Sequence, residues 1–346
     1  MNPIKNAWYA VALSSSITGK PIKRGMLGHP LVAYRGESGQ ATVLSDICPH
    51  RFAPLHQGKV KGDCIECPYH GLQFDTTGAC CVNPHGDGRI PRGAKVRAYP
   101  TLERNGVVWA WTGEPDLADP DAALDLSAYF ESRPLAVRLE LVINAHYEMV
   151  IDNLMDLSHG PFLHPTTLAD PDSISNLRME VQEDEGTVWS RHYMPQTKPM
   201  PQFAAYRKST EPLCDAHAHI QWLAPSNLLL DVGITDVGRP DSEGVYNKSA
   251  HLLTPIDMHS THYIWLNVRN FAVDDDRVTQ LMRERGGKAF TTEDGPMIEA
   301  AAMYMGTPDL LSLSPVWLPS DAGGVRVRRL LQQLRDKEAQ AANVRT

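Results

Sequence analysis

Two short stretches near the N-terminus combine cysteine with histidine. Cys48 and His50 stand two positions apart, and Cys67 and His70 stand three apart after an interval of sixteen residues. Each stretch offers one thiolate and one imidazole, and together they make the ligand set of a [2Fe–2S] cluster with two cysteines on one iron and two histidines on the other. Because neutral imidazoles replace two thiolates, such a cluster has a higher reduction potential than an all-cysteine ferredoxin cluster.

Structural zinc is the alternative at these four residues, because two cysteines and two histidines also bind zinc tetrahedrally. Cys64 and Cys67 even form a C-x-x-C pair. Zinc modules usually join such a pair to a second one or to a histidine pair, whereas here each stretch mixes the two residue types. Pro49 and Pro68 place both stretches in turns, whose remaining amides can face sulfur. We therefore expect the iron–sulfur cluster.

A second candidate metal site lies near the middle of the chain. Asp156 and His159 are three apart, so on a helix they share a face, and His164 follows five residues after His159. Gly160 and Pro161 are expected to break the helix, which allows both imidazoles to turn towards one point. Two imidazoles and one carboxylate make the facial triad of a mononuclear non-heme iron(II) site, which leaves positions open for oxygen.

The carboxylate of this triad must come from another part of the chain. Asp294 is the best candidate, since it stands in an acidic turn within a helical region, and Glu293 and Glu299 compete with it. Two histidines five apart are, in isolation, more often ordinary histidines. An electron-transfer centre in the same chain needs an acceptor, however, and this favours iron.

Composition describes a globular protein that is large enough for two domains: 346 residues, a net charge of −8 and 42% hydrophobic residues. The acidic balance argues against a nucleic-acid partner, and no apolar run approaches the roughly 18 residues that cross a bilayer. Six cysteines in a chain of this length are not a disulfide framework. The four outside the two stretches are expected to be free thiols in a reducing cytoplasm.

The pattern of apolar runs and turn residues divides the chain into two domains joined by a connector. Residues 1–115 read as all-β, with short apolar runs between Gly-, Pro- and Asp-containing turns. An acidic, proline-punctuated connector follows at 116–134, and 135–346 form a mixed domain. Its strands are expected at 139–143, 186–194, 218–233 and 246–270, and its helices at 147–157, 275–305 and 323–340.

With both sites in view, the chain resembles the Rieske non-heme iron oxygenases, most of all oxygenase subunits of the vanillate O-demethylase, dicamba monooxygenase and toluenesulfonate methyl-monooxygenase type. The resemblance runs nearly end to end, through 6–9, 46–55, 67–72, 152–157, 269–271 and 321–324. It implies an α+β chain, with an all-β Rieske domain followed by a helix-grip-type antiparallel sheet domain whose helices carry the iron.

The resemblance also implies roles for single residues. Cys48, His50, Cys67 and His70 match the cluster ligands, and His159, His164 and Asp294 match the iron ligands. Asn153 matches an asparagine near the iron. Asp156 matches a carboxylate that bridges a cluster histidine of one subunit to an iron ligand of the next, which implies a ring-shaped homotrimer; the alternative is that Asp156 only orients His159 within its own chain.

The substrate residues implied in this way are Asp231, His251 and Arg285. Arg285 stands where dicamba-type enzymes carry a tryptophan, so dicamba itself is doubtful as the substrate. An arginine at this position can pair with a substrate carboxylate or sulfonate, or it can be an ordinary surface residue.

The expected activity is oxidation of a methoxy or methyl substituent of an aromatic acid by O2. O-demethylation of a vanillate-like substrate would release formaldehyde. Electrons would come from NAD(P)H through a separate reductase of the flavin and plant-type ferredoxin kind. The alternatives are a cis-dihydroxylating dioxygenase subunit and a pure Rieske electron carrier, and the long second half argues against the carrier.

Overall fold

The computed structural model describes residues 3–165 and 176–345, and the chain divides into two compact units. The first unit joins Lys5–Asp125 with the short segment Thr254–Asp257, and the second contains the remainder of the chain. The expected connector, 116–134, is shared between the two units.

The first unit is built from short antiparallel strands. Its three sheets have the strand orders β1-β11-β10, β2-β3-β4-β9 and β5-β6-β7-β8. The strands are β1 (Trp8–Leu13), β2 (Ile22–Met26), β3 (His29–Arg35), β4 (Ala41–Ser45), β5 (Lys59–Lys61), β6 (Cys64–Glu66), β7 (Gln73–Phe74), β8 (Cys80–Val82), β9 (Ala98–Tyr99), β10 (Thr101–Arg104) and β11 (Val107–Trp111).

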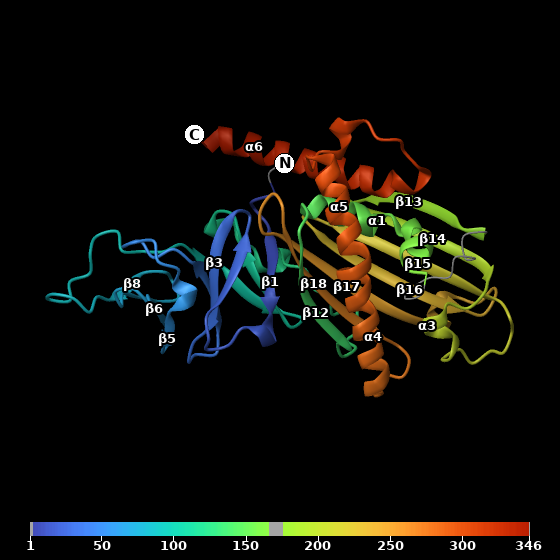
Figure 1. The fold of residues 1–346 in the computed structure, drawn as a ribbon, viewed down its shortest axis with the longest axis horizontal. Helices are drawn as coiled ribbons and strands as arrows, with labels where there is room; N and C mark the ends of the chain where they lie inside the picture. Colours follow the sequence, from blue (N-terminus) through green and yellow to red (C-terminus); the bar gives the residue numbers. More distant parts are fainter. Residues whose placement is uncertain (1–2, 166–175, 346) are drawn as a thin grey trace. The chain divides into compact units, whose positions relative to one another are not determined.

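The second unit is organised around one antiparallel sheet of seven strands in the order β12-β18-β17-β16-β15-β14-β13 (Figure 1). The long strands agree with the apolar runs expected from the sequence, except that 218–233 and 246–270 each span two strands and that the strand Arg178–Asp184 was not expected. They are β12 (Val137–Ile143), β13 (Arg178–Asp184), β14 (Thr187–Thr197), β15 (Cys214–Leu223), β16 (Asn227–Thr235), β17 (Val245–Pro255) and β18 (Thr261–Arg269).

Helices pack against one face of this sheet (Figure 1). The longer ones are α1 (Tyr147–Met155), α4 (Asp276–Lys288), α5 (Gly295–Met305) and α6 (Ala322–Arg345), and the short ones are α2 (Gly160–Leu163) and α3 (Pro201–Ala204). Between α4 and α5 the chain continues through a π-helix, Ala289–Asp294. The expectation of an all-β first domain and an antiparallel sheet with helices in the second is confirmed. No described helix is both long and apolar enough to cross a membrane.

A buried ion-pair network ties α6 to α1. Arg328 donates to the carboxylate of Asp152 from Nε at 2.9 Å and from Nη2 at 2.6 Å, and its Nη1 lies 3.4 Å from Glu148. Arg328 and Glu148 have exposed fractions of 2% and 0%. Because the charges compensate one another inside the protein, removing any one of them would leave its partners buried and unpaired.

The break in the helix of the second metal site differs from the expectation. The sequence placed it at Gly160 and Pro161, but α1 already ends at Met155, and Asp156 adopts a non-helical backbone with φ −104° and ψ 85°. Gly160 instead opens α2, where Pro161 occupies the first turn. A proline is well tolerated there, because the first amides of a helix have no intrahelical acceptor.

Candidate metal centres and substrate cavity

The two cysteine–histidine stretches form turns with the same hydrogen-bond pattern. The amide of Cys48 donates to Ala53 O at 3.0 Å and its carbonyl accepts from Phe52 N at 2.9 Å. In the second turn, Cys67 makes the corresponding bonds with Leu72 O at 2.8 Å and Gly71 N at 3.0 Å. Phe52 and Gly71 both have positive φ, 57° and 73°. Each cysteine is therefore anchored on both sides by its own turn.

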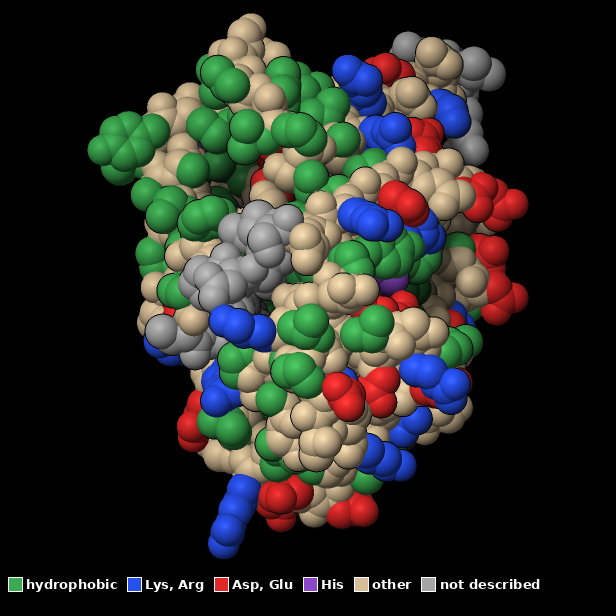
Figure 2. Space-filling model, turned by 90° about the vertical axis from the view of Figure 1, so that its right-hand side faces the viewer, with side chains coloured by type: hydrophobic (Ala, Val, Ile, Leu, Met, Phe, Trp, Pro, Cys, Tyr) green, Lys and Arg blue, Asp and Glu red, His purple; other side chains and the backbone are tan. Residues whose placement is uncertain are grey.

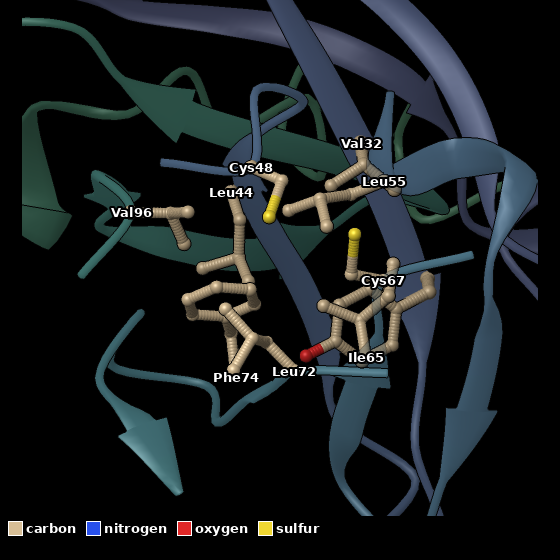
Figure 3. Close-up of a cluster of buried hydrophobic side chains, with 10 residues drawn as sticks. Val32, Leu44, Cys48, Leu55, Ile65, Cys67, Leu72, Phe74 and Val96 are labelled. Carbon is tan, nitrogen blue, oxygen red and sulfur yellow. The ribbon is translucent and has the colours of Figure 1, made fainter. Parts of the chain in front are cut away.

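The sulfurs of Cys48 and Cys67 face each other at the edge of a buried apolar cluster that includes Leu44, Leu55 and Phe74 (Figure 3). The two cysteines have exposed fractions of 1% and 2%. Burial raises the pKa of the Cys48 thiol to about 11. Thiolates at this position therefore need a compensating positive charge, which iron can supply.

The imidazoles complete the first site. The rings of His50 and His70 lie 4.4 Å apart between centroids. Nδ1 of His70 is buried and has no hydrogen-bond partner among the described residues, and the carbonyl of His70 lies 2.8 Å from Nε2 of His85. Two anchored thiols, two neighbouring imidazoles and a vacant ring nitrogen fit the ligand set of a histidine-containing [2Fe–2S] cluster.

The second site brings together the two histidines and the carboxylate that the sequence singled out. His159, His164 and Asp294 are the one such metal-binding group found among residues 3–165 and 176–345, with their ligand atoms within 4.8 Å of one another. Oδ1 of Asp294 lies 3.4 Å from His159 Nε2 and 3.1 Å from His164 Nε2. The donor set and its compactness fit a facial triad.

Electrostatics keep the carboxylate of this site ionised. Burial acts to raise the pKa of Asp294, but the hydrogen bonds with His159 and His164 outweigh it and lower the pKa to about 2. Nδ2 of Asn153 lies 3.3 Å from Oδ1 of the same carboxylate. Asn153, on α1, therefore contacts the triad through the carboxylate of Asp294.

The competing carboxylates have other partners. Oε2 of Glu293 accepts from His164 Nδ1 at 2.7 Å, on the opposite edge of the ring from Asp294. Oε1 of Glu299 accepts from the backbone amide of Asn144 at 2.8 Å. Neither belongs to the compact group of ligand atoms.

Asp156 contacts His159 in a different way from the expected side-chain bond. Nδ1 of His159 bonds the backbone carbonyl of Asp156. The carboxylate instead accepts from Ser158 N at 3.0 Å and Ser158 Oγ at 2.6 Å, and its second oxygen lies 3.3 Å from Ser320 Oγ. The reason is the early end of α1, which turns the main chain of Asp156 towards the ring and lets its side chain cap the following turn.

A cavity of about 310 Å³ lies beside the triad, between the helices and the sheet of the second unit. Its walls are mostly apolar, and they include Trp265 and Phe290, whose ring centroids are 5.4 Å apart. Gly286 allows α4 to approach β18, because a Cβ at this position would come within 2.7 Å of the Trp265 ring. This volume is at the lower end for small-molecule sites in proteins.

Two of the three expected substrate residues line this cavity. Arg285 is the one arginine or lysine among its described lining residues. His251 is fully buried, and burial lowers its pKa to about 3, so the ring is neutral. Its Nδ1 bonds the hydroxyl of Tyr263, and its Nε2 has no hydrogen-bond partner among the described residues. A ligand in the cavity can satisfy this nitrogen.

Asp231 does not line the cavity. Its neighbours on β16, Leu230 and Val232, do, and because successive strand residues point to opposite faces, Asp231 points away. There it lies 3.3 Å from His217 Nε2 and 4.0 Å from Lys248 Nζ. A displacement of one residue along a strand moves a side chain to the other face of the sheet, and the resemblance placed Asp231 only close to a cavity position.

Sequence reasoning missed His192, which lines the cavity from β14. Its exposed fraction is 3%, and its Nε2 has no hydrogen-bond partner within the described chain. Burial lowers its pKa, so the ring is neutral. The sequence feature that could have identified His192 is the alternation of side chains along β14, which puts His192 and the apolar Met194 on one face.

Each half of the chain matches a known protein family. Residues 7–100 match the Rieske [2Fe-2S] domain, and residues 143–337 match the vanillate O-demethylase oxygenase C-terminal domain. A pure electron carrier and a dihydroxylating dioxygenase are accordingly not favoured.

Similar proteins extend over nearly the full chain. The oxygenase component of dicamba O-demethylase from Stenotrophomonas maltophilia is 34% identical, with 98% of this chain and 100% of the relative covered. The oxygenase component of chloroacetanilide N-alkylformylase from Rhizorhabdus wittichii is 37% identical over 95% of this chain and 94% of the relative.

Solved structures give the same result. The crystal structure of dicamba monooxygenase bound to 3,6-dichlorosalicylic acid matches with a TM-score of 0.91 at 34% identity, over 98% of this chain and 99% of that chain. A dicamba monooxygenase structure with non-heme iron matches with a TM-score of 0.84 at 32% identity, over 99% and 100%. With the cysteine–histidine turns and the triad in place, the chain belongs to the Rieske non-heme iron oxygenases, as an oxygenase component of the vanillate O-demethylase type with a [2Fe–2S] cluster and a mononuclear iron.

Proposed function

We propose that this oxygenase oxidises a methoxy or methyl substituent of an aromatic acid, with O-demethylation of a vanillate-like substrate as the leading case. The observation that carries the proposal is the cavity beside the triad, whose walls are apolar except for a few polar groups and whose one described cation is Arg285. Such a site suits a benzene ring with one anionic substituent.

Each wall of the cavity has a role in this proposal. Trp265 and Phe290 offer ring faces and edges against which an aromatic substrate can pack. Arg285 pairs with the carboxylate, and the neutral His251 supplies a hydrogen bond from Nε2. These contacts hold the methoxy carbon beside the iron and exclude water from the reacting group.

Cys48, His50, Cys67 and His70 are the proposed cluster ligands, and His159, His164 and Asp294 the proposed iron ligands. The iron, when bound, supplies the activation of oxygen at its open positions. In balanced form, a methoxyarene, O2, two electrons and two protons give a phenol, formaldehyde and water. The electrons would come from NAD(P)H through a separate flavin and ferredoxin-type reductase, in the cytoplasm.

We further propose a homotrimer in which the cluster of one subunit serves the iron of the next. Exposed apolar side chains beside both metal sites support this. Phe52 and Tyr69, next to the cluster ligands, have exposed fractions of 78% and 65%, and Phe162, between the iron histidines, has 75%. Hydrophobic side chains also gather over α5 and the segment after it, which includes Val316 at 90% exposure (Figure 2). A second copy would cover surfaces of this kind.

The test is product analysis with a surrogate reductase and a panel of methoxylated, methylated and sulfonated benzoates, with a chloroacetanilide included because of the relative that is named for it. Formaldehyde and a phenol in equal amounts from a methoxybenzoate support O-demethylation. A cis-diol would contradict it, and turnover of the neutral amide alone would remove the aromatic acid from the proposal.

A further inference from the structure

His164 lies between two consecutive carboxylates. Its Nε2 lies 3.1 Å from Oδ1 of Asp294, and its Nδ1 lies 2.7 Å from Oε2 of Glu293. The side chains of His164 and Glu293 have exposed fractions of 3% and 12%. The second oxygen of Glu293 lies 3.4 Å from Nζ of Lys288. Glu293 is therefore directed at the imidazole from a nearly buried position.

The backbone that presents these carboxylates is irregular. Glu293 and Asp294 are the last two residues of the π-helix between α4 and α5. In an α-helix, consecutive side chains diverge by about 100°. The wider π turn, a rare form that occurs frequently at functional sites, brings both carboxylates to opposite edges of one ring.

The geometry points to Glu293 as the positioning residue of the iron site, acting through His164. By accepting the Nδ1 proton, Glu293 fixes the tautomer in which the Nε2 lone pair faces the metal, orients the ring and makes it a stronger donor. Glu293 is not itself a ligand, because it contacts the ring nitrogen on the far side from His159 and Asp294.

The two histidines of the triad are not equivalent in this arrangement. Nδ1 of His159 bonds a neutral acceptor, the backbone carbonyl of Asp156, whereas Nδ1 of His164 bonds a carboxylate. A hydrogen bond to an ionised acceptor is roughly twice as strong as one between neutral groups. His164 is therefore the more strongly held and more basic ligand of the pair.

The experiment compares Glu293→Gln and Glu293→Ala with Glu299→Gln as the matched control, since Glu299 bonds the backbone of Asn144 outside the triad. Ferrous iron is the probe, and its affinity is measured by competition with a chromophoric chelator, without substrate or reductase. The nitric oxide adduct of the bound iron gives an EPR spectrum that reports ligand geometry. The absorbance of the [2Fe–2S] cluster and the far-ultraviolet circular dichroism confirm that each variant is folded.

Glu293→Ala is expected to weaken iron binding by roughly 10- to 100-fold and to broaden the nitrosyl spectrum. Glu293→Gln keeps an acceptor for the Nδ1 proton but loses the charge, so it should fall between Ala and wild type. The proposal is overturned if Glu293→Ala binds iron with wild-type affinity and an unchanged spectrum, or if Glu299→Gln weakens binding equally. The inference rests on the proposed triad, and that assignment fails separately if His159→Ala retains iron.

Discussion

At the residue scale, the proposed histidine ligands would set the reduction potential of the cluster. Thiolates add negative charge beside the iron and neutral imidazoles do not. We predict that His70→Cys lowers the reduction potential by on the order of 100 mV or more, provided that the cluster assembles. Spectroelectrochemical titration measures this, and Cys64→Ser, which changes a nearby thiol outside the ligand set, should leave the potential unchanged. Purified protein with one zinc and no acid-labile sulfide would refute the cluster assignment.

Arg285 is expected to select the charge of the substrate. Removing a charged hydrogen-bond donor of this kind costs about 1.5–3 kcal/mol, or roughly 10- to 100-fold in affinity. Arg285→Leu should raise KM for the aromatic acid that the panel identifies by this factor and leave kcat less affected, while Arg285→Lys should lose only part of it. If KM for the acid and for its neutral methyl ester rise together, Arg285 shapes the cavity but does not recognise the charge of the substrate.

His217, on the sheet face opposite the cavity, is expected to make stability depend on pH. Burial acts to lower its pKa, but the neighbouring carboxylates of Asp231 and Asp241 outweigh burial and raise the pKa to about 9. The raised pKa means that the folded protein holds this proton more tightly. The resulting stabilisation, about 3 kcal/mol at most for a shift of this size, is complete below a pH of about 6.5 and is lost as the pH rises through about 9.

We therefore predict that His217→Gln lowers the urea midpoint at pH 6 and that the difference from wild type shrinks towards pH 10. His259→Gln, at another histidine of the same unit, serves as the control for general effects of the substitution. A constant difference at all pH values would mean that the charge of His217 does not contribute.

At the element scale, the hydrophobic periodicity of the sequence predicted most of the long strands and helices, but not the residues at which they end. The apolar runs that became β14, β17 and β18 are long and bounded by turn residues, so pattern alone located them. The break at Asp156 depended on a side chain that caps the next turn, and this competes locally with helix continuation. The orientation of Asp231 depended on register, which only pairing with β15 and β17 settles.

The same limit applies to the candidate site. The cysteine–histidine turns and the histidine pair could be proposed from residue type and spacing, because metal ligands are few and chemically distinct, whereas Asp294 was one of three candidate carboxylates and was chosen through the family resemblance. His192 and the contact of Glu293 with His164 were not found, because they depend on which face of a strand or which edge of a ring is presented. These are properties of three-dimensional packing.

The junction of α1 and α6 should be sensitive to loss of one charge. Arg328→Met leaves Glu148 and part of Asp152 buried without their cation, and breaking such a network costs about 3–5 kcal/mol. We expect a lower urea midpoint for the second unit, followed by tryptophan fluorescence. Arg329→Met, an exposed neighbour, should change it little. A variant as stable as wild type would show that the ion pairs stabilise the folded protein no more than apolar packing at this position does.

At the scale of the whole molecule, the two metal sites belong to separate units of one chain, while electron transfer requires short distances between metals. The proposed head-to-tail ring of three subunits would provide this by a heterologous interface that closes on itself. Asp156 is suited to the junction, because its carboxylate is only half-buried and its bonds to Ser158 and Ser320 leave acceptor positions open. His70 of a second copy could donate to one of them.

Asp156→Asn should therefore leave both metals bound and the cluster reducible, while electron transfer to the iron slows by roughly 100-fold. Single-turnover mixing of the reduced protein with oxygen and substrate measures this as the rate of cluster reoxidation, and Asp184→Asn, an exposed carboxylate on β13, controls for surface charge. Sedimentation of the same samples gives the oligomeric state. If Asp156 acted only within its own chain, dilution to monomers would not slow wild-type turnover per site; a monomer that turns over at the full rate would thus exclude the route between subunits.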